Sequence, residues 1–185
     1  MSHNIGEEIV GTYLKVIKGC EFVDYNINTT ESQGEIDVIG VDNINKKVYI
    51  CEVAIHLETG LQYTNLVTKR PDNTSRLISK FEKDAHYARQ RFENFENIFM
   101  FWSPIVKAPK NETRYNQLTS VKDAQTYLKE KSNIDLILVV NEDFQKCLEE
   151  LKDYSWQQSQ ELKTPVLRLM QIEEKLRRFV AKTAN

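Results

Sequence analysis

Apolar side chains recur with a helical period at the start of the chain and with a strand period after it. Over residues 4–18 they recur every three or four positions, which predicts a helix with Asn4 as its N-cap and Gly19 as its stop. The face expected to be buried consists of Ile5, Ile9, Tyr13, Val16 and Ile17. Three strands are expected next, at residues 21–28, 35–41 and 48–56. The third is rich in β-branched and aromatic residues, which favours a central place in the sheet.

Within these strands, alternation and turn residues predict how the side chains are oriented. The first strand is expected to alternate strictly, with Val23, Tyr25 and Ile27 on one face. Residues 42–47, DNINKK, are typical of a turn that joins the second and third strands as a hairpin.

In the second half of the chain, helices alternate with two apolar strands. A helix with a clear apolar stripe is predicted over about residues 74–93, after a long loop at 57–73. The remaining elements are a strand at 98–104, a helix at 118–131, a strand at 134–140, and helices at 143–156 and 165–182. The unbroken apolar run at 134–140 is typical of a strand that is buried on both faces. In the last helix, Ile172, Leu176 and Phe179 are expected to point inward.

The order α-β-β-β-α-β-α-β-α-α predicts an α/β domain with a mixed sheet. We expect one domain over residues 1–185, with a core at 4–140 and a C-terminal helical extension at 141–185, because no linker or repeat divides the chain. Apolar residues make up 41% of the chain and charged residues 28%, which is ordinary for a globular protein.

Composition also bears on the compartment. No apolar run approaches the roughly 20 residues that span a bilayer, so no membrane helix is expected. The N-terminus lacks the basic and apolar regions of a signal peptide. Cys20, Cys51 and Cys147 are widely spaced, which predicts neither a disulfide framework nor a zinc site. We therefore expect a cytoplasmic protein.

The net charge of −2 conceals two basic segments. Residues 69–91 hold seven Lys or Arg against three acids, and residues 163–185 hold six against two, so each segment carries +4. Such charges are either the solvated faces of helices or local surfaces that follow a phosphate backbone. Composition alone leaves both interpretations open.

Residues 50–56 read ICEVAIH, so a glutamate lies within an apolar strand. A buried carboxylate without a partner is costly, and Glu52 therefore needs a partner or a metal. The hairpin is expected to bring Asp37 beside Glu52, because the side-chain period of a strand is two. Two facing carboxylates repel unless a divalent cation lies between them, and Mg²⁺ prefers such oxygen ligands.

This arrangement resembles the PD-(D/E)XK nuclease superfamily, in particular its Holliday-junction resolvase and Mrr-like restriction endonuclease branch. The resemblance rests on GEID at 34–37, on EV at 52–53 and on the order of elements, and it covers residues 4–103. It implies a restriction-endonuclease-like αβββαβ core with additional C-terminal helices. It also implies that Asp37, Glu52 and the carbonyl of Val53 bind Mg²⁺, for which Mn²⁺ can substitute. The implied reaction is hydrolysis of a phosphodiester bond by a metal-activated water.

One position departs from the family pattern, because Ala54 stands where the family has a lysine. In some branches that lysine has moved to the following helix, which here offers Lys80 and Lys83. Lys80 is the favoured replacement, since it flanks the apolar stripe and can extend along the sheet toward Asp37 and Glu52. The alternative is a degenerate nuclease that only binds nucleic acid.

Further residues have both a functional and a structural interpretation. Glu7 matches a first-helix glutamate that some branches use near the metal, and it equally suits the N-terminus of any helix. His56 either contacts the phosphate or bonds a nearby carbonyl at the strand end. Lys69 and Arg70 lie in the long loop and, with Lys83, are candidates for contacts to nucleic acid. Tyr63 in the same loop either stacks on a base or packs.

The function that this reading favours is a Mg²⁺-dependent DNA nuclease acting in repair, recombination or defence. The first alternative is an inactive nuclease-fold module that binds nucleic acid or regulates. The second is a protein-interaction domain in which Asp37 and Glu52 pair with Lys80 or Lys83 as a buried network. DNA is the expected partner, and a homodimer is one expected assembly because two strands must be cut.

Overall fold

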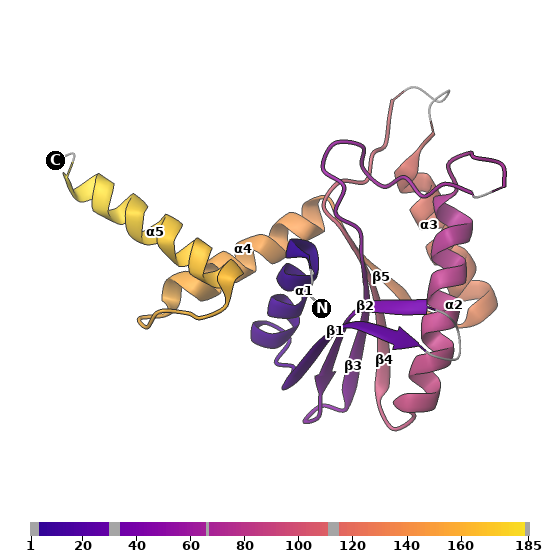
Figure 1. The fold of residues 1–185 in the computed structure, drawn as a ribbon, viewed down its shortest axis with the longest axis horizontal. Helices are drawn as coiled ribbons and strands as arrows, with labels where there is room; N and C mark the ends of the chain where they lie inside the picture. Colours follow the sequence, from indigo (N-terminus) through magenta and orange to yellow (C-terminus); the bar gives the residue numbers. More distant parts are fainter. Residues whose placement is uncertain (1–3, 30–33, 66, 111–114, 184–185) are drawn as a thin grey trace.

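The predicted order of helices and strands is present in the computed structural model, which describes residues 4–29, 34–65, 67–110 and 115–183 (Figure 1). The elements are α1 (Ile5–Val16), β1 (Phe22–Thr29), β2 (Gly34–Asp42), β3 (Lys47–Val53), α2 (Asn73–Arg91), β4 (Glu96–Ser103), α3 (Gln117–Ser132), β5 (Leu136–Val140), α4 (Glu142–Gln157) and α5 (Pro165–Thr183). Asn4 caps α1 as predicted, because its side chain accepts from the amides of Gly6 and Glu7.

The five strands form one mixed sheet in the order β1-β2-β3-β4-β5. β1, β2 and β3 pair antiparallel, whereas β4 and β5 run parallel to β3. The predicted α/β fold with a helix, three antiparallel strands, a helix and a further strand is thereby confirmed, and β3 is the central strand.

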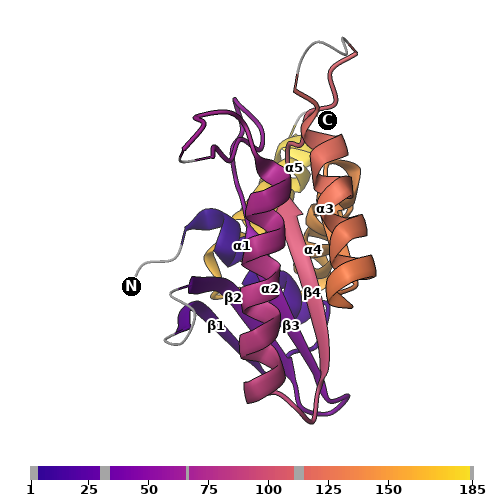
Figure 2. The same cartoon turned by 90° about the vertical axis from the view of Figure 1, so that its right-hand side faces the viewer.

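Helices cover both faces of the sheet and make two apolar cores (Figure 2). α2 and α3 pack on one face, against strand residues that include Ile50 and Phe101. α1, α4 and the first part of α5 pack on the other face, against residues that include Cys51 and Trp102. The alternation along β3 sends Ile50 to the first core and its neighbour Cys51 to the second.

The β1–β2 hairpin bends at one position. Its paired residues run in one register from Phe22 to Thr29 but skip Asn26, which has a left-handed φ of 53° and lies opposite Asp37. Before the bend, Tyr25 packs in the second core; after it, Ile27 packs in the first. The strict alternation expected for the first strand therefore fails at Asn26. The bend turns the end of the hairpin toward α2 (Figure 1).

One further expectation about the strands is wrong. The third strand ends at Val53 rather than at residue 56, so His56 lies beyond it. β5 does bury side chains on both faces, as expected, with Leu136 in the first core and Val139 in the second. It is nevertheless an edge strand, and Ile137 is 44% exposed.

The apolar faces of α1 and α5 also differ from expectation. In α1, Ile5 is exposed and the buried face includes Val10 and Leu14 instead. In α5 the expected inward residues are wrong, because Ile172, Leu176 and Phe179 are all exposed. The buried residues of α5 lie in its first part, and the rest of the helix projects from the domain (Figure 1). No helix in the described part of the chain is both long and apolar enough to span a membrane.

α1 lies close to β2 because residue 40 is a glycine. A Cβ placed on Gly40 would stand 2.8 Å from Leu14 Cδ1 and 3.2 Å from Leu14 Cβ. Since Leu14 is fully buried, the helix would have to move away from the sheet. We expect Gly40→Ala to lower the free energy of unfolding by about 1–3 kcal/mol in urea denaturation. Asn43→Ala, at an exposed turn position, is the control, and equal stability of the two variants would contradict this account.

Candidate active site

The hairpin brings Asp37 and Glu52 together. In the β2–β3 register, Val38 pairs with Cys51, so Asp37 and Glu52 are the next facing residues along the strands. The amide of Val53 donates to Asp37 Oδ2 at 2.7 Å, which anchors that carboxylate beside Glu52. The carbonyl of Val53, which the resemblance nominates as a metal ligand, is a different atom from this amide, and its role stays a prediction.

The surroundings of Asp37 disfavour its charged form. Burial and the neighbouring charge of Glu52 raise the pKa of Asp37 from 3.8 to about 8, although the Val53 amide and Lys80 act in the opposite direction. A proton or another cation is therefore favoured at this carboxylate near neutral pH.

Lys80 reaches the two strands from α2. Its Nζ lies 2.9 Å from Glu52 Oε2 and 3.0 Å from Asp84 Oδ2, and it donates to the carbonyl of Glu35. The Lys80 and Glu52 side chains are only 22% and 13% exposed. Burial lowers the pKa of Lys80, but attraction to Glu52, Asp84 and Asp37 outweighs this effect and raises it overall. Of the two helix lysines, Lys80 is thus the one that meets Glu52.

Asp84 is a member of this network that sequence reasoning missed. Its side chain is 1% exposed, and burial raises its pKa from 3.8 to about 6 even though Lys80 acts to lower it. The available signal was its place between Phe81 and Ala85 on the apolar stripe of α2. An acid at that place, four residues after Lys80, needs a cationic partner.

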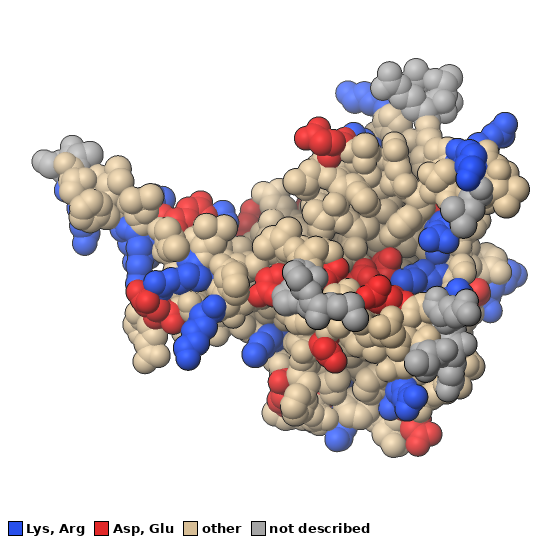
Figure 3. All heavy atoms as spheres, viewed as in Figure 1, with Lys and Arg blue, Asp and Glu red and all other residues tan. Residues whose placement is uncertain are grey.

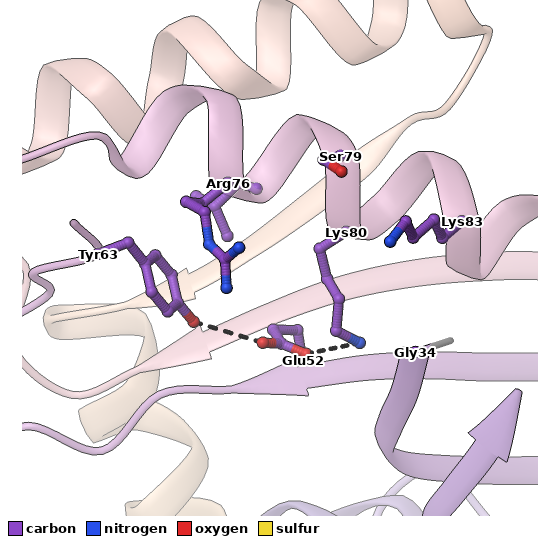
Figure 4. A pocket seen from close by; sticks show the side chains of 8 residues that line it. Gly34, Glu52, Tyr63, Arg76, Ser79, Lys80 and Lys83 are labelled. Atoms are coloured by element: carbon purple, nitrogen blue, oxygen red, sulfur yellow. Dashed lines mark hydrogen bonds and ion pairs between the residues drawn. The ribbon is translucent and has the colours of Figure 1, made fainter. Parts of the chain in front are cut away.

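A pocket of about 250 Å³ opens between α2 and the strands (Figure 4). It is lined by Gly34, Glu52, Tyr63, Arg76, Leu77, Ser79, Lys80 and Lys83. The Tyr63 hydroxyl donates to Glu52 Oε1 at 3.3 Å, so Tyr63 holds the second oxygen of that carboxylate. Burial, followed by the nearby charges of Glu52 and Asp37, raises the pKa of Tyr63 and keeps its hydroxyl protonated.

Other predicted residues lie apart from this network. Both carboxylate oxygens of Glu7 bond to Asn4 in the cap of α1, and Glu7 Oε2 also accepts from Asn26 at 3.2 Å. His56 is exposed beyond β3. Lys69 and Arg70 are exposed in the loop before α2 and are not among the residues that line the described pocket.

The residues at the pocket fit a hard divalent cation in part. Glu52 Oε2 is buried and receives no well-aligned hydrogen bond from the described residues, although Lys80 lies within ion-pair distance. Within the described ranges no group of three or more His, Cys, Asp or Glu side chains is placed to hold a metal. Asp37 and Glu52 would thus be the only acidic side-chain ligands that these residues supply, with water and phosphate oxygens as the other ligands.

Comparison of the chain with protein-family models, with curated proteins and with solved structures finds no match.

The role of Lys80 in stability can be separated from that of Lys83. Lys80→Met would leave Glu52 and Asp84 buried without their cation, and we expect it to lower the free energy of unfolding by about 3 kcal/mol or more. Lys83→Met should change it by less than about 0.5 kcal/mol, because Lys83 is exposed and forms no ion pair with the described residues. Urea denaturation at pH 7.5 measures both values, and equal losses would show that Lys80 is not the linking cation.

The pH dependence of stability tests the environment of Asp37. Its folded-state pKa of about 8 lies above the unfolded value of 3.8, so the folded protein holds the proton more tightly. The contribution of Asp37 to stability should therefore fall as the pH rises toward 8, by about 1 kcal/mol per pH unit in EDTA. Asp84, with a pKa of about 6, also titrates at the lower end of the range from pH 6 to 8, so a variant that changes Asp37 alone is needed to isolate its contribution.

In the same experiment, Asp37→Asn should flatten the slope between pH 6 and 8, whereas Asp153→Asn on the exposed side of α4 should keep it. A parent protein whose stability is constant across this range would contradict the assigned environment of Asp37.

Proposed function

We propose that this chain is a metal-dependent nuclease that hydrolyses phosphodiester bonds in DNA. The observation that carries the proposal is the pair of facing carboxylates, Asp37 and Glu52, of which Glu52 lines a pocket that also contains the ammonium group of Lys80. Acidic ligands beside fixed cations suit a reaction in which negative charge develops on a phosphate.

The fold supports this proposal. A helix, three antiparallel strands, a helix and a strand around a mixed sheet are the elements of the PD-(D/E)XK core that the sequence resembles. Ala54 stands at the family's lysine position and is buried. Lys80 approaches Glu52 from α2, which is the direction expected of a relocated lysine.

In this proposal the residues have distinct tasks. Asp37 and Glu52 hold Mg²⁺ or Mn²⁺, which when bound supplies an acidified water and neutralises charge on the phosphate. Tyr63 and Lys80 fix the two oxygens of Glu52, and the Val53 amide fixes Asp37, so both carboxylates are oriented before substrate arrives.

A second candidate function is nucleic-acid binding without hydrolysis. The observation that favours it is the crowding of oxygens around Lys80, which is surrounded by Glu52, Asp84 and the Glu35 carbonyl. A lysine so engaged is a structural cation as much as a catalytic one. The two candidates share the fold and the pocket but differ in whether DNA is cut.

Cleavage of supercoiled plasmid in Mg²⁺ or Mn²⁺ tests the proposal. The parent protein should nick or cut the plasmid, and Glu52→Gln should reduce the rate by roughly 100-fold or more, because a loss of several kcal/mol corresponds to such a factor. Glu35→Gln is the matched control, since Glu35 lies on the same hairpin with an exposed side chain, and its rate should stay close to that of the parent.

Thermal denaturation gives a readout that is independent of substrate. Mn²⁺ should raise the melting temperature of the parent and of Glu35→Gln but not that of Glu52→Gln, because a ligand stabilises the state that binds it. Stabilisation by Mn²⁺ without cleavage of plasmid, linear duplex or single strand would favour the binding module. Cleavage of plasmid by Glu52→Gln at the parental rate would contradict the proposed site.

A further inference from the structure

The ammonium group of Lys80 is already surrounded by oxygen atoms of the protein. An ammonium has three N–H groups, and three oxygen-bearing groups lie around this one: the carboxylates of Glu52 and Asp84 and the carbonyl of Glu35. A phosphate entering the pocket would have to displace one of them to contact Lys80. Two of the three are buried carboxylates, whose loss of their cation is strongly unfavourable.

Two other cations line the same pocket and have no such partners among the residues that the structure describes. Arg76 and Lys83 lie four residues before and three residues after Lys80, so all three project from one face of α2. Neither Arg76 nor Lys83 forms an ion pair or side-chain hydrogen bond with any residue in the described ranges. Basic side chains gather over α2 beside the acidic residues at the hairpin end (Figure 3).

The guanidinium of Arg76 is the cation aimed into the pocket. Figure 4 shows it beside the Tyr63 ring, pointing toward Glu52, whereas Lys83 lies nearer the opposite end of the pocket. The charge of Arg76 lowers the pKa of the Tyr63 hydroxyl, although burial has a larger effect in the opposite direction. Arg76 therefore interacts with the residue that donates to Glu52.

We propose that Arg76, with Lys83 beside it, is the binding site for a backbone phosphate of the nucleic acid, and that Lys80 positions Glu52 instead of contacting the substrate. This inference rests on the proposed function, since it names the part of the substrate that the pocket receives. A guanidinium suits the task because its planar fork matches two phosphate oxygens, and it stays charged at any relevant pH. Arg76 then sets a phosphate beside the carboxylates that would hold the metal.

Binding of DNA without metal tests Arg76 separately from hydrolysis. A fluorescein-labelled 20-nucleotide single strand and its duplex are titrated with the full chain in EDTA at low salt, and anisotropy reports the Kd. We expect Arg76→Ala to weaken binding roughly tenfold or more and Arg76→Lys to have an intermediate effect, because lysine keeps the charge but not the fork. Lys83→Ala should have a smaller effect than Arg76→Ala.

Arg89→Ala is the matched control. Arg89 is an exposed arginine at the far end of the same helix, where it donates to the carbonyl of Ser132, and its replacement should leave the Kd within about twofold of the parent. The melting temperature of each variant with Mn²⁺ shows whether the carboxylates still bind metal. Arg76→Ala should keep that stabilisation, because Arg76 contacts no ligand of the metal.

The outcomes separate this inference from the proposed function. Weaker binding by Arg76→Ala but not by Arg89→Ala supports the phosphate site, even where the parent cuts no DNA and the nuclease proposal fails. The inference is overturned if Arg76→Ala binds as the parent does, if the parent binds neither form of DNA, or if Arg76→Ala and Arg89→Ala weaken binding equally. It is also overturned if Arg76→Ala cuts plasmid at the parental rate.

Discussion

The ammonium group of Lys80 joins the elements between which the pocket lies. Lys80 lies on α2, and its ammonium contacts Glu52 on β3 and the carbonyl of Glu35 on β2. It also forms an ion pair with Asp84, one turn further along the same helix. A charge so little exposed to water is tolerated because each neighbouring oxygen offsets part of its desolvation. The same contacts fix the distance between helix and hairpin, so the shape of the pocket follows from this one group.

The bend at Asn26 makes that contact geometrically feasible. A flat hairpin would leave the start of β2 in the plane of the sheet, away from α2. The left-handed backbone of Asn26 interrupts the pairing opposite Asp37, and beyond it the strands turn toward the helix. Asn tolerates this conformation better than most residues. The Asn26 side chain also donates to Glu7 in the cap of α1. One irregular residue thereby places a backbone carbonyl at Lys80 and ties α1 to the same corner of the sheet.

Periodicity was sufficient for the order of the elements and for the facing of Asp37 and Glu52, because a hairpin register follows from a short turn and a period of two. It also indicated that Lys80 rather than Lys83 lies beside Glu52, since Lys80 flanks the stripe that packs on the sheet, whereas a catalytic role for Lys80 stays a prediction. It missed Asp84 and Arg76, because a helical pattern shows which residues share a face but not which groups of other elements those residues contact. The exposure of Leu176 and Phe179 could not be predicted either. An amphipathic pattern shows that a helix has an apolar face, but not whether another part of the chain packs against that face. The roles proposed for Asp37, Glu52 and Val53 toward a metal remain predictions.

The sheet separates the pocket from the projecting part of α5, because α2 and α5 belong to opposite cores (Figure 1). A molecule lying along the exposed side of α5 would not cover the opening of the pocket. It could therefore bind at the same time as a ligand in the pocket. The exposed side of α5 can therefore be occupied, altered or fused to another polypeptide without covering the pocket.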